Sequence, residues 1–445
     1  MAMTDNEILD LVVVGECPLD VLMDWSPPIA RPGGTCYSSC AASALGARVG
    51  IVSDVGKDML AGQLTQVASM GVDVSGIEVV DCESIVYEIS NCAEIVPQNV
   101  YVRGIRSRTP RSTHIPQICK GAKGLLVYPY QMDVVLPLIE EIKTRGGHVY
   151  FDLQHDVTNL SDWHSTLGRS DVVFASSTEL IRNTGQANEQ AAVNHVLGLG
   201  VPILVVKHGI NGSVIYKASG SVEKIPAFLA SFQATIGAGD VYNAVFALAH
   251  SAGSDTETAG KRAALASSIF IEHVEFSKWT HALQQIDLES HSGSRTPISF
   301  TPEDLAKNRI YIAGHFQSLP HREWVDRVTL ALECRDLPVF SPYRDAGLLT
   351  PRSLNEDRYT AFEADLNAIR SSSIVVALLD GLGRGGVSFE LGYAYSLGIP
   401  IFGVLTDNGI PISNMLMQAC EAIYPNLPQL INGLYEHLSM INKVP

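Results

Sequence analysis

The stretch Ala234–Asp240, ATIGAGD, combines small residues with a carboxylate in a pattern suited to chemistry on an anion. It lies between a hydrophobic, strand-like segment and an alanine-rich segment, 241–252, that is typical of a helix. Small residues let the backbone approach a ligand closely, and a helix start offers free N–H groups to an anion. Asp240 beside that anion suits a general base that activates a hydroxyl for attack on a phosphate. The alternative is a glycine-rich turn with a capping aspartate.

A second set of reactive side chains occurs in the last third of the chain. Tyr311 lies on a predicted strand, Asp365 on a predicted helix, and Glu390 where a glycine-rich loop enters a helix. Two carboxylates and a tyrosine in one pocket suit the cleavage of a glycosidic bond. One carboxylate can attack the anomeric carbon, and the other, when protonated, can assist the leaving group. The alternative is structural: Glu390 as an acid at a helix start, Asp365 on a solvated helix face, and Tyr311 in the core.

The first elements of the chain place another carboxylate near a strand end. The apolar run 9–15 predicts a buried strand, and Asp20 follows it. Open α/β sheets bind ligands at the carboxyl ends of their strands, so Asp20 is a candidate for holding the hydroxyls of a polyol. The alternative is an aspartate in a surface loop. Gly33 and Gly34 precede a helix predicted at 35–45, where close packing or a ligand contact explains them.

Strand and helix patterns alternate through most of the region that carries these residues. After a predicted helix at 60–70, short alternating strands at 85–89 and 99–102 predict a small antiparallel flap or lid within 76–104. From residue 124 onward, apolar strand-like runs alternate with helical patterns near 133–145 and 188–199. This alternation predicts a doubly wound, mostly parallel α/β sheet.

A composition change near residue 290 predicts a domain boundary. Residues 288–308 are rich in Ser, Thr and Pro and read as a linker or surface connection. Beyond it, strands at 309–313, 374–379 and 400–405 alternate with helices, which predicts a smaller doubly wound domain. The predicted organisation is therefore a first domain at 1–290, a linker at 291–308 and a second domain at 309–445.

Bulk properties exclude several classes of protein. The chain has 445 residues, 46% of them hydrophobic and 18% charged, which is typical of a globular protein with two or three domains. Its formal net charge of -16 argues against nucleic acid and anionic membranes as partners. The 8 cysteines form no CxxC pair and are interpreted as reduced thiols without a metal. No signal peptide or membrane span is apparent, so a cytoplasmic location is expected.

Several motifs in the first 285 residues occur together and in order: GECPLD with Asp20, GG at 33–34, LGA, VGKD, FDLQ, STEL, VVKHGINGS and ATIGAGD. Together they resemble the ribokinase-like (PfkB) sugar and nucleoside kinases. The resemblance implies a ribokinase-like sheet with a small β lid. It also implies transfer of a phosphoryl group from ATP, with Mg²⁺, to a hydroxymethyl group of a sugar or nucleoside.

The resemblance also implies a role for each matching residue. Asp240 would be the catalytic base. The anion hole would consist of three backbone amides, those of Gly237, Ala238 and Gly239. The sugar would be contacted by Asp20, Gly33 and Gly34. The nucleotide site would be bordered by Lys207, Gly209 and Gly212. Glu179 would help to place Mg²⁺ through water, without any residue binding the metal directly.

Departures from the family pattern surround these residues. Ala234 stands where the family usually has an aspartate, and Ser38 and Ser176 stand where it usually has asparagines. The arginine that commonly follows the FDLQ position is missing. The base and the anion hole are kept while the sugar and metal contacts have changed. An active kinase is therefore predicted, with a kinase fold retained for binding or scaffolding as the alternative.

The last third of the chain resembles a second family through IYIAGHF, EADLNAI, VALLDG and SFELGYA, in that order over about 309–430. These motifs are similar to those of the nucleoside 2-deoxyribosyltransferases, which implies a flavodoxin- or Rossmann-like domain. By this resemblance Glu390 is the nucleophile that forms a glycosyl-enzyme ester, Asp365 the acid/base near the departing base, and Tyr311 the residue that orients Glu390. Asn414 resembles the asparagine that a neighbouring subunit contributes, which implies a homo-oligomer.

One departure in this second region predicts the substrate. Arg384 occupies the position six residues before Glu390 where transferases of free nucleosides usually carry an aspartate that binds the 5′-hydroxyl. An arginine at this position would attract a 5′-phosphate. The loop amides around Gly386 and Ser388 and the start of the following helix would add to this attraction. The sequence therefore predicts a nucleoside 5′-monophosphate as substrate. The alternative is an arginine that faces solvent.

The two regions together predict a bifunctional enzyme of nucleotide and nucleoside metabolism. One domain would phosphorylate a sugar or nucleoside, and the other would cleave or transfer an N-glycosidic bond. The main alternative is a kinase-like domain that only senses a nucleotide, joined to a domain that degrades nucleotides or NAD as a toxin or defence effector. A scaffold of two inactive domains is a third possibility.

Overall fold

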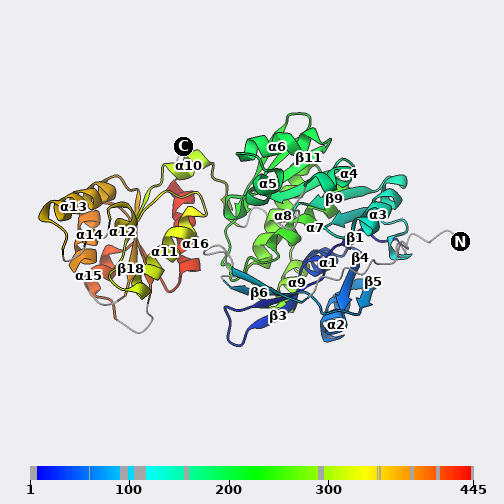
Figure 1. Cartoon of the computed structure of the whole chain (residues 1–445), viewed down its shortest axis with the longest axis horizontal. Helices are drawn as coiled ribbons and strands as arrows, with labels where there is room; N and C mark the ends of the chain where they lie inside the picture. The colour runs from blue at the N-terminus through cyan, green and yellow to red at the C-terminus, as the bar shows by residue number, and fades with distance from the viewer. Residues whose placement is uncertain are drawn as a thin grey trace. The chain divides into compact units, whose positions relative to one another are not determined.

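The computed structural model describes residues 8–59, 61–90, 99–104, 117–154, 160–288, 295–347, 349, 352–380, 385–406 and 411–441. These residues form two compact units, unit 1 up to Ser299 and unit 2 from Phe300. The predicted α/β class is confirmed, because each unit contains a mainly parallel sheet with helices packed on it (Figure 1). Within the described ranges, no helix combines the length and the apolar character needed to cross a membrane.

Unit 1 is built on a nine-stranded sheet with the order β13-β12-β11-β10-β9-β8-β1-β4-β5. Its strands from β11 to β5 are parallel, and β12 and β13 are antiparallel at one edge. The bounds are β1 Leu11–Val14, β4 Val49–Gly56, β5 Val72–Val80, β8 Gly124–Val127, β9 His148–Asp152, β10 Val172–Ser176, β11 Ile203–Lys207, β12 Ser213–Lys217 and β13 Val222–Ile225.

Helices cover both faces of this sheet because successive strand residues point to opposite sides. On β1, Leu11 and Val13 pack into one core, whereas Val12 and Val14 pack into the other. The first core includes α1 Thr35–Ala44, α2 Ala61–Ser69, α7 Ala238–Ser251, α8 Thr256–Phe270 and α9 Phe276–Gln284. The second includes α3 Met132–Thr144, α4 His164–Leu167, α5 Ser177–Thr184 and α6 Glu189–Gly198. Short 3₁₀ turns are η2 Gln117–Cys119, η3 Leu160–Trp163 and η4 Gly209–Asn211.

A second, four-stranded sheet of unit 1 forms the predicted lid, but it draws on more of the chain than predicted. Its order is β3-β2-β6-β7, with bounds β2 Leu19–Leu22, β3 Ile29–Pro32, β6 Val86–Ser90 and β7 Asn99–Arg103. The strand β2 pairs in parallel with β6, which lies more than sixty residues later in the sequence. Residues 76–80 belong instead to β5 of the large sheet, which corrects the predicted extent of the lid.

The strand order creates a crevice at the carboxyl end of β1. From β1 the chain proceeds to β4 on one side, and later to β8 and onward on the other side. Such a point of reversal leaves a ligand-sized crevice outside the carboxyl ends of the strands. Helix α7 packs against both α1 and β8, so its first turn lies at this end of the sheet.

The segment predicted as a linker contains two short elements. The strand β15 Pro297–Ile298 pairs with β14 Ala227–Phe228 of unit 1. The helix α10 Pro302–Ala306 begins unit 2 with a capping box formed by Thr301 and Asp304. The predicted boundaries at 291–308 remain a proposal.

Unit 2 contains a five-stranded parallel sheet with the order β17-β16-β18-β19-β20. The strands are β16 Ile310–Ala313, β17 Val339–Phe340, β18 Ile374–Leu379, β19 Ile401–Leu405 and β20 Ala422–Tyr424. The helices are α11 Leu319–Glu333, α12 Pro342–Asp345, α13 Asn355–Arg370, α14 Gly385–Ser396, α15 Asn414–Ala419 and α16 Leu427–Ile441. The polar segment 344–358 contains the end of α12 and the start of α13.

Candidate active sites

The glycine-rich stretch of unit 1 forms the start of α7. Gly237 is its N-cap, in the left-handed region with a φ of 89°, and no side chain caps the helix. A Cβ atom at Gly237 would lie 2.7 Å from the Tyr37 ring, and one at Gly239 would lie 3.3 Å from Lys207 Nζ. Gly237 is therefore needed where the backbone turns over Tyr37, whereas a side chain at Gly239 would only crowd the flexible end of Lys207. The amides of this first turn, with a lysine beside them, suit an anion.

Asp240 lies in the first turn of α7, where a carboxylate also suits the helix dipole. Burial raises the pKa of Asp240 to about 8, and the charge of Asp152 adds to this effect, while Lys207 opposes it. Lys207 Nζ donates hydrogen bonds to Asp152 Oδ1 at 3.2 Å and to Asn243 Oδ1 at 3.1 Å. A carboxyl with a raised pKa beside an anion site is the arrangement that a general base requires.

Asp20 lies on a strand of the lid and is buried, so the alternative of an aspartate in a surface loop is wrong. It is 4% exposed on β2, and its Oδ2 accepts a hydrogen bond from the Tyr37 hydroxyl at 2.5 Å. Burial raises its pKa to about 6, against the effects of Tyr37 and Arg31. A Cβ atom at Gly33 would lie 2.5 Å from Asp20, and one at Gly34, whose φ is 54°, would lie 2.6 Å from a backbone oxygen. The three predicted sugar-contacting residues therefore lie together, but Tyr37 already bonds the carboxylate.

The predicted nucleotide border follows β11. Lys207 is the last residue of β11, Gly209 begins η4 with a φ of 56°, and Gly212 follows η4 with a φ of 90°. A Cβ atom at Gly212 would lie 2.2 Å from Ile225 O, so only glycine fits there. Glu179 closes a capping box on α5, its Oε2 accepting from Ser176 N at 2.9 Å and from Ser176 Oγ at 2.7 Å.

These residues fit an ATP–Mg²⁺ complex. Lys207 and the first turn of α7 offer positive charge and amides to phosphate oxygens. The charge of Glu179 acts on Asp152, which places two carboxylates near one another beside Lys207. Oxygen-rich surroundings of this kind suit a Mg²⁺ ion that keeps several of its waters.

The sequence reasoning missed several residues that bear on Asp240. Asp152 ends β9, and burial raises its pKa. Ser38 Oγ donates to Asp240 O at 2.9 Å and shares a 2.5 Å hydrogen bond with Tyr128 Oη. Ser38, which departs from the family pattern, thus contacts the catalytic turn. A signal for Asp152 was present, since it ends an apolar run at a strand terminus.

The structure brings Tyr311, Asp365 and Glu390 of unit 2 together. They lie on β16, α13 and α14 respectively. Tyr311 Oη, Asp365 Oδ1 and Glu390 Oε2 are buried polar atoms that find no hydrogen bond of full geometry among the described residues, although the Tyr311 hydroxyl lies close enough to the Glu390 carboxyl to lower its pKa. Such orphaned atoms are costly in a folded protein unless a ligand satisfies them. Tyr311 also stacks on Phe340 in the core, with ring centroids 5.8 Å apart, so it has a structural role as well.

The two carboxyls influence one another. Burial raises the pKa of Glu390 to about 8, the charge of Asp365 raises it further, and the Tyr311 hydroxyl lowers it. Burial raises the pKa of Asp365 to about 6. Burial and both carboxylates also raise the pKa of Tyr311, which therefore stays protonated as a donor. Two interacting carboxyls in these surroundings share one proton over the neutral range.

The remaining predicted residues of unit 2 lie around α14. Gly386 and Ser388 belong to its first turn. Asn414 begins α15, which packs against α14, and its side chain is exposed. Arg384 lies outside the described residues, so its predicted contact with a phosphate stays a prediction.

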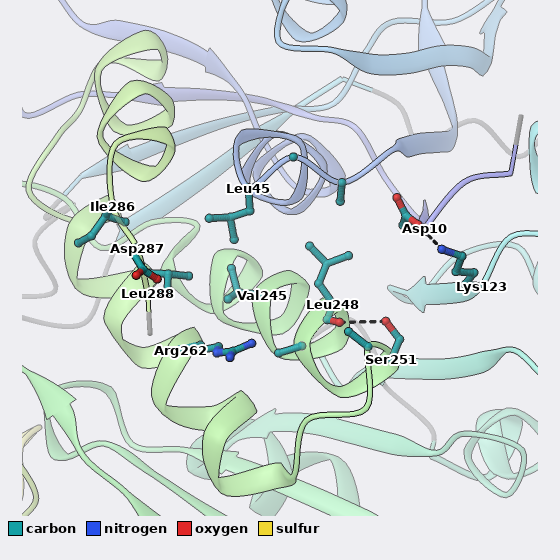
Figure 2. A pocket seen from close by; sticks show the side chains of 14 residues that line it. Asp10, Leu45, Lys123, Val245, Leu248, Ser251, Arg262, Ile286, Asp287 and Leu288 are labelled. Carbon is teal, nitrogen blue, oxygen red and sulfur yellow. Dashed lines mark hydrogen bonds and ion pairs between the residues drawn. The ribbon is translucent and has the colours of Figure 1, made fainter. Parts of the chain in front are cut away.

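A pocket of about 470 Å³ lies beside the amino ends of β1 and β8, and Figure 2 shows the side chains that line it. Its lining includes Asp10 and Lys123, whose side chains form an ion pair just before β1 and β8, and Ser251 at the end of α7. Ser251 follows Asp240 by eleven residues in α7, and a helix rises about 1.5 Å per residue, so this end of the pocket lies roughly 16 Å from Asp240 along the helix. It is not part of either candidate active site.

Comparisons with known families confirm both predicted resemblances. Residues 118–279 match the model of the pfkB family carbohydrate kinases. Residues 310–420 match the model of the nucleoside 2-deoxyribosyltransferases. The first match contains Asp240 and Lys207, and the second contains Tyr311, Asp365 and Glu390.

Characterised relatives of the first region are sugar-acid kinases by name. The 5-dehydro-2-deoxygluconokinase of Bacillus subtilis is 33% identical over 122 residues, which are 27% of this chain and 37% of that protein. The chain thus spans little more than a third of that relative in the matched segment. The enzyme of the same name from Lacticaseibacillus casei aligns over 308 residues at 23% identity, covering 62% of this chain and 94% of that protein.

Solved structures share the fold of the kinase-like region. The ribokinase of Arabidopsis thaliana, solved with ribose and ATP, superposes with a TM-score of 0.53 at 19% identity, covering 63% of this chain and all of that chain. The adenosine kinase of Sinorhizobium meliloti gives a TM-score of 0.53 at 17% identity, with 62% and 98% coverage. The predicted ribokinase-like sheet with a small lid is therefore confirmed as a fold.

Proposed function

We propose that the chain is a bifunctional enzyme of nucleotide and sugar metabolism. Unit 1 transfers a phosphoryl group from ATP to a sugar or nucleoside hydroxymethyl group. Unit 2 cleaves or transfers the N-glycosidic bond of a (deoxy)nucleoside 5′-monophosphate. The observation that carries the proposal is the pairing of a half-buried base, Asp240, with an anion-binding turn in unit 1, and of two half-buried carboxyls, Asp365 and Glu390, in unit 2.

In unit 1, Asp240 takes the proton of the acceptor hydroxyl as that oxygen attacks phosphorus. The amides of Gly237, Ala238 and Gly239 stabilise negative charge that develops on the phosphoryl oxygens. Lys207 adds positive charge beside Gly239. When bound, ATP supplies the phosphoryl group and Mg²⁺ neutralises charge on its phosphates.

The acceptor contacts Asp20, Gly33 and Gly34 in this proposal. The sugar hydroxyls compete with Tyr37 for Asp20, because the Tyr37 hydroxyl bonds its carboxylate in the free protein. The relatives named 5-dehydro-2-deoxygluconokinase suggest a sugar acid as one acceptor to test beside pentoses and nucleosides.

In unit 2, the proton that the two carboxyls share lies on Asp365 in the reactive form, and ionised Glu390 attacks the anomeric carbon while the bond from that carbon to the base breaks. The departing base takes a proton from Asp365, and the sugar remains as an ester of Glu390. Water or a second base then attacks the anomeric carbon, gives its proton to Asp365 and releases Glu390. Tyr311 orients the Glu390 carboxylate through its hydroxyl.

The sugar 5′-phosphate is held at the start of α14. Its first turn includes Gly386 and Ser388, and a Cβ atom at Gly386 would meet nothing within 4 Å, so a ligand can approach the backbone. Arg384 would complete this phosphate site. Comparing turnover of a deoxynucleoside with its 5′-monophosphate tests the preference, and faster cleavage of the free nucleoside would contradict it.

The second site is completed by another copy of the chain. Asn414 is exposed on α15, and large apolar side chains are exposed nearby on the helices of this unit. They include Tyr359, Phe362, Phe389, Tyr395, Met415 and Met417. An exposed apolar group of this size is typical of an interface. We place the resulting homo-oligomer in the cytoplasm, with small molecules as its partners.

A second candidate function is a kinase-like unit that only binds a nucleotide, while unit 2 degrades nucleotides or NAD. The hydrogen bond from Tyr37 to Asp20 favours it, because a group of this protein already occupies the predicted sugar contact. Consumption of ATP with a panel of sugars, sugar acids and nucleosides distinguishes the two. Base release without any ATP-dependent product would support the second function.

Mass spectrometry of a mixture of nucleosides, nucleotides and sugars incubated with ATP tests the main proposal. Wild type should give a phosphorylated product and a free base. Asp240→Asn should lose only the phosphorylated product, and Glu390→Ala should lose only the free base. Glu356→Ala, at the exposed start of α13, is the control and should keep both. Base release that persists in Glu390→Ala would exclude the glycosidase assignment.

A further inference from the structure

Arg31 is a buried cation in the lid. It lies on β3 opposite Asp20 of β2, yet it is only 2% exposed. Arginine is rarely buried to this extent unless its charge and its N–H groups find partners. Its surroundings therefore indicate what it does.

The guanidinium donates to three oxygens, two of which are carbonyl oxygens from distant parts of unit 1. Nη2 donates to Ile236 O at 2.8 Å, and Nη1 donates to Val274 O at 3.0 Å. Nε donates to the Tyr37 hydroxyl at 2.8 Å. The guanidinium also lies over the rings of Tyr37 and Phe270, with 5.0 and 5.6 Å to the centroids. Its planar fork thus joins the lid to two loops near α7.

One of these oxygens belongs to the catalytic turn. Ile236 immediately precedes Gly237, the N-cap of α7, so its carbonyl fixes the peptide from which the anion-binding turn begins. The Ile236 and Val274 carbonyls point at the same cation from two loops. Without that cation they would be left as buried acceptors with no donor, which is unfavourable.

A third bond links the same guanidinium to the sugar site. The Tyr37 hydroxyl accepts from Arg31 Nε and donates to Asp20 Oδ2 at 2.5 Å. Arg31 therefore makes no direct bond to the carboxylate but orients it through Tyr37. Arg31 therefore contacts the turn that would bind phosphate, and through Tyr37 it also reaches Asp20, which would bind the acceptor.

We propose that Arg31 is a positioning residue for phosphoryl transfer, which holds the Ile236 carbonyl so that the amides of the α7 turn face the phosphate. Through Tyr37 it also couples this turn to Asp20, so the lid and the anion-binding turn keep a fixed relation. The inference rests on the proposed kinase function. It predicts that the guanidinium itself matters, since a lysine offers a point charge in place of a fork with three directed donors.

Kinetics of Arg31→Gln, Arg31→Lys and the control Arg103→Ala test the proposal. Arg103 lies on β7 of the same small sheet, with its side chain 53% exposed and paired to Glu88. Arg31→Gln should lower kcat about 10²-fold, with a smaller change in the KM for the acceptor, because misplacement of the turn acts on the reacting geometry. Arg31→Lys should recover little of this loss, and Arg103→Ala should match wild type. Equal kcat in wild type and Arg31→Gln would overturn the proposal.

Chemical rescue separates positioning from general instability. Guanidinium chloride at about 50 mM, compared with sodium chloride at the same ionic strength, should raise kcat of Arg31→Gln about tenfold and leave wild type unchanged. Failure of guanidinium to raise kcat of a folded Arg31→Gln protein above the sodium chloride control would contradict the assignment.

Amide hydrogen exchange of the full chain tests the coupling without any catalytic assay. Arg31→Gln should speed exchange in segments 234–240 and 271–276, and leave α6 unchanged. Uniformly faster exchange throughout unit 1, or no change in these segments, would overturn the proposal. If wild type phosphorylates no acceptor while these segments respond as expected, the kinase function fails, and what stands is that Arg31 holds the α7 turn in place and couples it to the lid.

Discussion

Asp240 is a carboxyl whose ionisation should control phosphoryl transfer. Burial and the nearby Asp152 raise its pKa to about 8, so below that pH it is mainly protonated and is unable to accept a proton. We expect kcat/KM for the acceptor to rise up to tenfold per pH unit below about 8 and to level above it. Profiles from pH 6 to 9.5 check this. A profile that is flat between pH 6 and 8 would contradict Asp240 as the base.

The carboxyl pair in unit 2 should give a different pH profile. The pKa of Asp365 is raised to about 6 and that of Glu390 to about 8, in both cases mainly by burial. Bond cleavage needs one group ionised and one protonated, so it fails below about pH 6 and above about pH 8. We expect a bell-shaped profile of kcat/KM for base release. Asp365→Asn should lose the alkaline limb, and a bell that persists in this variant would contradict the pairing.

The same burial means that ionised Glu390 lowers the stability of the folded protein. Its pKa is raised in the folded state, so its stabilising contribution is complete below about pH 4.5 and is lost as the pH rises through about 8. Glu390→Gln stays neutral, so it should melt roughly 5 °C above wild type at pH 8 and equal to it near pH 4.5. Scanning calorimetry at both values checks this. Glu356→Gln, at an exposed position, should show no such difference.

At the scale of the element, the two ends of α7 offer a matched pair of glycines. Gly237 and Gly253 have φ values of 89° and 93°, so alanine is strained at either position. Only Gly237 would place its Cβ against the Tyr37 ring, 2.7 Å away, whereas nothing lies within 4 Å at Gly253. Gly237→Ala should lower the free energy of unfolding by about 3 kcal/mol and the phosphorylation rate by at least about 10²-fold. Gly253→Ala should lower the free energy of unfolding by about 1 kcal/mol and keep normal activity. Urea unfolding and kcat measurements check both, and equal losses would contradict the steric argument.

Most elements were predictable from local patterns, and the exceptions have identifiable causes. Helix α1 at Thr35–Ala44 and strand β9 at His148–Asp152 lie where the apolar patterns predict them. The strand β2 was missed because its partner β6 lies far along the chain, and no local pattern records that pairing. Asp20 was therefore expected just after the first strand, at its carboxyl end, and not on a strand of the lid.

At the scale of the whole molecule, the proposed oligomer makes each second site depend on two copies. Glu390→Ala lacks the nucleophile, and Asn414→Ala lacks the group contributed to a neighbour. Each variant alone should release no base. When the two variants are mixed and allowed to reassociate as dimers, about a quarter of the wild-type rate should return. About half of the dimers then contain one copy of each variant, and each of these dimers has one intact site out of two. Base release rates before and after mixing check this, and no recovery from a reassociated mixture would contradict a shared site.

The sequence by itself determined the α/β class and both family resemblances, and it supplied the side chains that are proposed to react. Those features depend on local periodicity and on short motifs such as GAGD, which neighbouring residues define completely. Glycines such as Gly33 and Gly237 also indicated positions where a side chain lies close to the backbone, because few other residues fit there.

Only the tertiary structure determines which side chains lie beside these groups and how far their pKa values are shifted. Arg31 reaches Ile236 and Val274 across 205 and 243 residues of sequence, and such contacts leave no trace in a local pattern. The raised pKa values of Asp240 and Glu390 likewise follow from burial and from charges brought near by folding. Burial and charge proximity are properties of the packed chain, so the roles of these residues emerge only when distant segments meet.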